Sequence, residues 1–255
     1  MSAFITLRLD DQVVILTDGA VYPGYHDFTI IGYANKVWTF PHLDMVVAWR
    51  GTSDLCGLLL YKKSHKWTSF DMLLRELVEH AEEECDRFGT LWPGRDGACE
   101  LAVCGWSDDR ETFETYSFNM DTNAAICKPP QLTEQLYMAP FPDLSCMEAL
   151  GIAANGHINI TAVDQLKLLM QAQRDTAHYM GHPGDDADRA ERGHCVGAFI
   201  QQTTLSRGHI TSTIVKRWPD ELGERIDPAN GRIEALGADR LPPGAGENDY
   251  GETAP

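Results

Sequence analysis

The sequence predicts an α+β fold in which two stacked antiparallel sheets carry helices on both outer faces, a four-layer αββα sandwich. Three observations lead to this class. Strand-like runs fill most of residues 3–50, helical spacing follows between residues 53 and 89, and strands, a helix and further strands come after it. Because short polar turns join successive strands, we expect hairpins and therefore antiparallel pairing.

The N-terminal part of the chain is predicted to be nearly all sheet. Residues 3–9 and 13–18 are apolar-rich runs separated by Asp10 and Asp11, which is typical of a hairpin. Three further strand candidates follow, at residues 28–32, 35–40 and 45–50.

Two consecutive helices are expected next. Ser53 can cap the first helix, in SDLCGLLLYKKS, and Thr68 with Asp71 resembles a capping box for the second. Leucines and an alanine then recur at helical spacing, and Gly89 is the expected terminator. We expect both helices to pack against a sheet.

Strands and a third helix are predicted in the middle of the chain. Residues 99–106 and 112–118 flank a polar turn and predict a second hairpin. The stretch 160–180 carries a long amphipathic pattern, with Thr161 and Asp164 as its capping box.

The C-terminal part combines a last hairpin with a tail. Residues 195–205 and 209–218 predict the hairpin. From Pro219 onward the composition shifts to Pro, Gly and acidic residues, which cannot bury enough apolar area to fold alone. We therefore divide the chain into a domain, residues 1–218, and an acidic tail or arm, residues 219–255.

Composition and charge argue against two classes of partner. The formal net charge is -17, whereas a nucleic-acid partner normally requires clustered Lys and Arg. The sequence contains no apolar run near the roughly 20 residues that span a bilayer, and its start does not resemble a signal peptide. We expect a soluble protein that binds neither nucleic acid nor membrane.

The seven cysteines signal neither a metal nor a disulfide framework, because they are scattered without a CxxC pair. No glycine-rich phosphate loop is present either, so we expect no cofactor. His194 and Cys195 are adjacent, but neighbours on a strand point to opposite faces, which argues against their joint work as base and nucleophile.

Several short stretches carry a resemblance to a known family. They are the amino terminus with Ser2, ILTDGA with Asp18, NKVWTF with Lys36, VVAWRGTSDL with Arg50 and Gly51, and QRDTAH with Asp175. With the element order over residues 2–218, they resemble a bacterial-type proteasome β subunit of the N-terminal nucleophile (Ntn) hydrolase superfamily. The C-terminal half is also faintly similar to proteins of prophages.

The resemblance implies an amide hydrolase, a peptidase or amidase. Ser2 would be the nucleophile once Met1 is removed, and its free α-amino group, with a pKa of about 7.7–8.0, would relay the proton. Lys36 would lower that pKa by like-charge repulsion, and Asp18 would hold Lys36 charged and oriented. The backbone amide at Arg50 or Gly51 would complete the oxyanion hole. Asp175 would stand at the position of the family's supporting aspartate.

Departures from the family pattern support a second hypothesis. Ser2 replaces the usual threonine, Arg50 occupies the place of a small residue, and His178 stands where a serine normally follows the supporting aspartate. The expected serine-glycine segment is missing from QLTEQLYMAPFPDL. The chain could therefore be a degenerate relative kept for assembly in a ring complex or a phage virion. Its location would then be the virion instead of the cytoplasm.

Simpler interpretations of the single residues stay open. Ser2 is a common type of residue after Met1, Asp18 could cap a turn, and Lys36 could be an exposed strand residue. For the tail we expect an extended arm on a neighbouring subunit of a homo-oligomer or a larger assembly. Leu241 and Tyr250 are its expected anchors.

Overall fold

The computed structural model describes residues 3–24, 27–124, 127–154, 157–158, 160, 162–179 and 191–234. The expected nucleophile Ser2, the cap Thr161 and the expected anchors Leu241 and Tyr250 lie outside these residues. The predicted α+β class is confirmed, since helices combine with several antiparallel sheets. No helix among the described residues has both the length and the apolar character needed to cross a membrane.

The first large sheet joins the two ends of the domain. Its strand order is β10-β1-β2-β15-β16, and every neighbouring pair is antiparallel. The hairpin of the amino terminus thereby lies beside the last hairpin, with β2 paired to β15. The strands are β1 (Phe4–Arg8), β2 (Gln12–Asp18), β10 (Leu136–Ala139), β15 (Phe199–Ser206) and β16 (His209–Arg217).

The second large sheet follows chain order, β5-β6-β7-β8-β9, because each strand turns back on its predecessor. Its strands are β5 (Val37–Phe40), β6 (Met45–Gly51), β7 (Ala98–Ser107), β8 (Thr112–Asp121) and β9 (Gln131–Leu132). Three short antiparallel pairs complete the strands of the described residues. They are β3 (Ala20–Val21) with β4 (Gly32–Tyr33), β11 (Ala153–Ala154) with β12 (His157–Ile158), and β13 (His178–Tyr179) with β14 (Arg192–Gly193).

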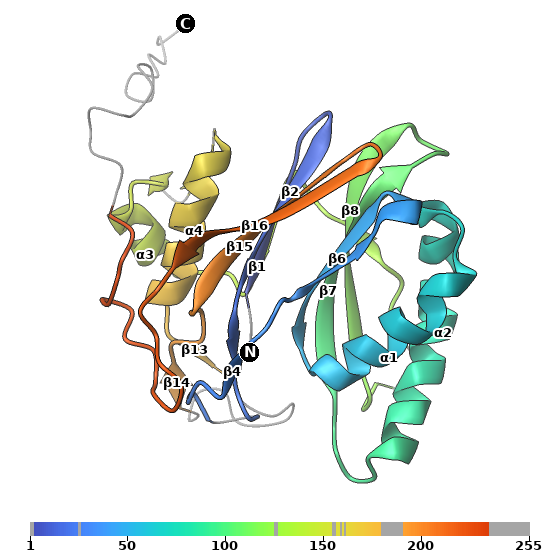
Figure 1. The fold of residues 1–255 in the computed structure, drawn as a ribbon, viewed down its shortest axis with the longest axis horizontal. Helices are drawn as coiled ribbons and strands as arrows, with labels where there is room; N and C mark the ends of the chain where they lie inside the picture. Colours follow the sequence, from blue (N-terminus) through green and yellow to red (C-terminus); the bar gives the residue numbers. More distant parts are fainter. Residues whose placement is uncertain are drawn as a thin grey trace, which may run out of the picture.

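Helices flank the two sheets (Figure 1). The helices α3 (Leu144–Ala149) and α4 (Leu166–Asp175) share a buried core with β1 and β2, whereas α1 (Ser53–Lys63) and α2 (Phe70–Leu91) share another with β6, β7 and β8. A third core, between the sheets, includes Phe4, Ile15, Val46 and Phe113. Most buried apolar side chains of the sheets and helices thus belong to one of these three cores.

Two helices differ from the sequence prediction at their ends. The cap of α2 is Ser69, whose hydroxyl accepts from the Met72 amide at 3.1 Å, and Thr68 lies one residue outside. Asp71 binds the Ser107 hydroxyl instead, at 2.9 Å. The helix also runs past Gly89, because a single glycine lowers helix stability by only about 1 kcal/mol and does not force an end.

The third predicted helix is shorter than residues 160–180. α4 begins after the 3-10 turn Val163–Gln165 and ends at Asp175. Its end is fixed by Thr176, whose hydroxyl donates to the Ala172 carbonyl at 2.9 Å and accepts from the Asp143 amide at 2.8 Å. These bonds hold Thr176 in an extended conformation, so the helical spacing does not continue.

Of the predicted strand 28–32, only Gly32 lies in a strand, β4, because Ile30 binds the C-terminal segment instead. Ile30 donates its amide to the Glu224 carbonyl at 3.0 Å, and the Gly223 amide donates back to Ile30 at 2.9 Å. Ile226 is buried against the same cluster. Residues 219–234, which we assigned to the tail on composition, therefore pack on the domain of their own chain.

Candidate functional site

A buried ion pair lies where the first large sheet meets the second. Asp18 ends β2 and Lys36 directly precedes β5, and their side chains are 0% and 1% exposed. Lys36 Nζ donates to Asp18 Oδ1 at 2.7 Å and to the Ala20 carbonyl at 2.6 Å. The alternative of an exposed Lys36 is therefore wrong, and the two residues named by the resemblance are in direct contact.

The carboxylate of Asp18 also binds three backbone amides. Its Oδ1 accepts from Ala3 at 2.8 Å, and its Oδ2 accepts from Ala20 at 3.1 Å and from Gly197 at 3.3 Å. These donors lie directly before β1, at the start of β3 and in the loop before β15. Asp18 thereby fixes the beginning of the described chain to the centre of the site.

Burial shapes the acid-base chemistry around this pair. It lowers the pKa of Lys36, although the Asp18 charge and its hydrogen bond act in the opposite direction. Burial also raises the pKa of Cys195 to about 11, and the Lys36 and Asp18 charges both act on this thiol. Cys195 is therefore a protonated thiol at neutral pH, which argues against a nucleophilic role.

Gly51, the expected oxyanion residue, occupies a backbone conformation that requires glycine. It is the last residue of β6, its φ is +103°, and it pairs with Cys99. A Cβ atom there would lie 2.3 Å from the Ala98 carbonyl oxygen. The tight approach fixes the strand-to-helix turn that leads into α1.

Arg50 lies in β6, directly before Gly51. Its Nε lies 3.4 Å from Glu100 Oε2, and its side chain is 19% exposed. Burial has the largest effect on the pKa values of Cys195 and His178, and the Arg50 charge lowers both. A partly buried arginine, paired with Glu100, therefore stands at the position where the resemblance implies a small residue.

Asp175, the expected supporting aspartate, binds other partners. It ends α4, where Oδ1 accepts from Gln171 Nε2 at 2.8 Å and Oδ2 lies 2.8 Å from Arg232 Nη2. Within the described chain, no hydrogen bond or ion pair joins it to Asp18 or Lys36. Its contacts are instead with its own helix and the C-terminal segment.

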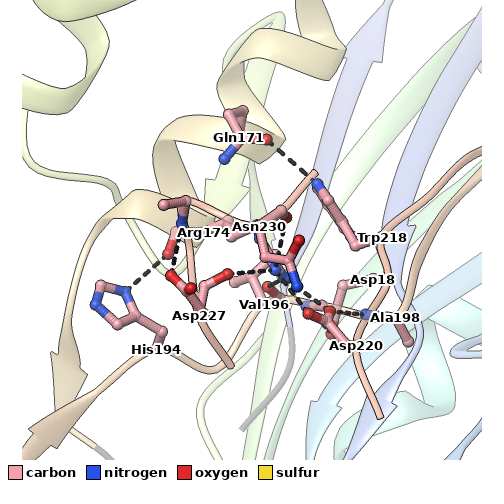
Figure 2. A network of polar contacts seen from close by, with 12 residues as sticks. Asp18, Gln171, Arg174, His194, Val196, Ala198, Trp218, Asp220, Asp227 and Asn230 are labelled. Carbon is pink, nitrogen blue, oxygen red and sulfur yellow. Dashed lines mark hydrogen bonds and ion pairs between the residues drawn. The ribbon is translucent and has the colours of Figure 1, made fainter. Parts of the chain in front are cut away.

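The sequence prediction missed a second buried ion pair, Arg174 with Asp220, one residue before Asp175 (Figure 2). The division of the chain at residue 218 hid it, because Asp220 was assigned to the tail. An arginine on the apolar face of a helix was the available signal, since such a side chain needs an acidic partner when it is buried.

Comparisons with known proteins show the fold and no closer relationship. No family model and no curated protein matches this sequence. Among solved structures, the chain is similar to Anbu (ancestral beta-subunit) from Yersinia bercovieri, with a TM-score of 0.52, 11% identity, and 86% of this chain and 88% of that chain covered. A second similar structure is the Gly-1 mutant of Anbu from Hyphomicrobium sp. strain MC1, with a TM-score of 0.50, 9% identity and coverage of 85% and 87%. The chain therefore shares its fold with an ancestral beta-subunit, in agreement with the resemblance to β subunits.

Proposed function

We propose that this chain is a proteasome-β-like protein with the four-layer αββα arrangement of Ntn hydrolases, and that it hydrolyses amide bonds with Ser2. The observation that carries the proposal is the bond from the Ala3 amide to Asp18, which also accepts a bond from Lys36. A peptide bond joins Ser2 to the Ala3 nitrogen. The α-amino group and hydroxyl of Ser2 would therefore lie within reach of Lys36.

The proposed reaction uses Ser2, Lys36 and a backbone amide at Arg50 or Gly51. Ser2 Oγ attacks the substrate carbonyl carbon while its proton passes to the α-amino nitrogen. The tetrahedral intermediate then expels the leaving amine, which takes that proton, and an ester with Ser2 remains. Water hydrolyses the ester by the same relay. Lys36 lowers the pKa of the α-amino group by its charge, and an amide at Arg50 or Gly51 binds the oxyanion.

Intact-mass measurement and acylation test this proposal together. On protein from its native source, we expect loss of Met1 and stoichiometric labelling at Ser2 by an activated-ester probe. Ser2→Ala should abolish labelling and Lys36→Met should slow it. The matched control Ser145→Ala, near the start of α3, should label like the wild type. Retention of Met1 in native protein would rule the mechanism out.

The second candidate is a degenerate relative retained for assembly, in a cytoplasmic ring or a virion. The half-buried Arg50 favours it, because this large cation stands where the resemblance implies a small residue. Absence of labelling after verified removal of Met1 would support this role. An arm toward neighbouring copies would then begin after residue 234, so truncation there should lower the oligomeric state without unfolding the domain.

A further inference from the structure

The pair of Arg174 and Asp220 joins the last turn of α4 to the C-terminal segment. The side chains are 0% and 3% exposed. Arg174 Nη1 donates to Asp220 Oδ2 at 2.8 Å, and Nη2 donates to Oδ1 at 2.7 Å. This two-point geometry is the strong, directional form of an arginine-carboxylate contact.

The guanidinium holds further segments through carbonyl groups (Figure 2). Nη1 also donates to Val196 at 3.0 Å, and Nη2 donates to Asp227 at 2.8 Å. The ring of Trp218 lies 4.7 Å from the Arg174 carbon Cζ. Arg174 therefore ties the loop before β15 and residues 218–227 to α4.

Three consecutive residues of that loop are fixed by the two ion pairs. The Val196 carbonyl binds Arg174, the Gly197 amide binds Asp18 at 3.3 Å, and the Ala198 amide donates to Asp220 at 2.7 Å. Ala198 has a φ of +67°, which a residue with a side chain rarely adopts unless its surroundings impose it. The loop conformation is thus imposed from both sides.

The packing around Gly197 leaves no free space. A Cβ atom there would lie 2.5 Å from Ile226 Cδ1 and 2.6 Å from Asp220 Oδ2. Burial raises the pKa of the Tyr22 hydroxyl, and the charges of Asp18 and Asp220 act in the same direction. The two ion pairs therefore belong to one buried region.

We propose that Arg174 and Asp220 are positioning residues, which hold loop 196–198 over Asp18 and Lys36 and make the C-terminal segment part of the functional domain. The expected effect on the rate of acylation rests on the proposed function, whereas the expected effect on the surroundings of Lys36 does not. Opening of the loop would withdraw one amide from Asp18 and admit water to the ion pair. A pair that served stability alone would leave the environment of Lys36 unchanged in the folded variant.

The test replaces Asp220 by Asn in the full-length chain. We expect the pKa of Lys36 to rise toward its ordinary value, because burial is the main cause of its lowering and Asp18 and Cys195 are the titratable groups that act on it. Carbon NMR of labelled lysine side chains measures this pKa, with Lys36→Met for assignment. The control Glu191→Gln removes an exposed ion pair with Arg225 on the same segment and should not change it.

The rate of acylation is the second readout. In Asp220→Asn it should fall about tenfold or more, since small displacements of a reacting site are costly. A shifted pKa without labelling in any variant, the wild type included, would reject the proposed function and support the positioning role. An unchanged pKa of Lys36 in folded Asp220→Asn would overturn the positioning role. If that variant does not fold, Arg174→Lys keeps the charge without the two-point contact, and the same readout decides.

Discussion

The pH dependence of stability gives a quantitative test of the structure at His178. This side chain is 7% exposed, and its Nε2 donates to the Gln173 carbonyl at 2.9 Å. Burial lowers its pKa from 6.5 to about 4, and the Arg50 charge adds to this effect while the bond to Gln173 opposes it. The ring is therefore neutral in the folded protein above about pH 4.

The sign follows from proton binding. Between pH 4 and 6.5 the unfolded chain binds more protons at this residue than the folded chain, so stability rises with pH and is lost as the pH falls. A shift of about 2.5 pKa units corresponds to roughly 3 kcal/mol at 1.36 kcal/mol per unit. Other groups titrate in the same range, so the contribution of His178 must be read as a difference between variants.

Urea unfolding at several pH values, followed by tryptophan fluorescence, measures that difference. His178→Gln keeps an N–H donor for the Gln173 carbonyl and removes the titration. We expect the wild type to lose roughly 3 kcal/mol more than this variant between pH 6.5 and 4. His209→Gln, at an exposed position, should behave like the wild type. Parallel curves for wild type and His178→Gln would refute the reasoning.

Two further predictions concern the residues of the candidate site. Lys36→Met should lower the free energy of unfolding by about 3–5 kcal/mol, because Asp18 is then left as an unpaired buried charge. The double variant with Asp18→Asn should lose less free energy of unfolding than the sum of the two single variants. Additive values in urea unfolding would contradict the pairing. Gly51→Ala should lower it by more than about 2 kcal/mol, since the new Cβ would lie 2.3 Å from the Ala98 carbonyl oxygen at a φ of +103°. The matched change Gly57→Ala, inside α1 with no atom near the new Cβ, should raise stability by about 0.5–1 kcal/mol, and equal melting temperatures for the two variants would contradict this account.

Local pattern was sufficient to predict the hairpins and most helices. The apolar-rich runs of β1 and β2 and the polar turn between β7 and β8 are properties of neighbouring residues, and the structure confirms both hairpins. Which hairpins share a sheet is not a local property. The pairing of β2 with β15 joins residues 12–18 to 200–206, and no short pattern encodes that choice.

The candidate site was likewise predicted only in part. Asp18 and Lys36 were named by resemblance, and the structure brings them into contact at 2.7 Å. The role of Asp175 stays a prediction. Its side chain binds Gln171 in α4 and Arg232 in the C-terminal segment. The contacts of residues 219–234 with the domain were missed because composition was averaged over residues 219–255, whereas packing depends on single side chains such as Asp220 and Ile226.

The sequence of α4 contains a signal for the ion pair of Arg174 with Asp220. Leu166, Met170 and Arg174 recur at a spacing of four, so the arginine continues the apolar face of α4. An arginine keeps its proton in a protein interior, and a buried guanidinium therefore requires a carboxylate and several carbonyl groups. Its neighbour Asp175 lies about 100° away around the helix and cannot serve as that partner. The acid must come from elsewhere in the chain, and the described tail residues supply it at Asp220.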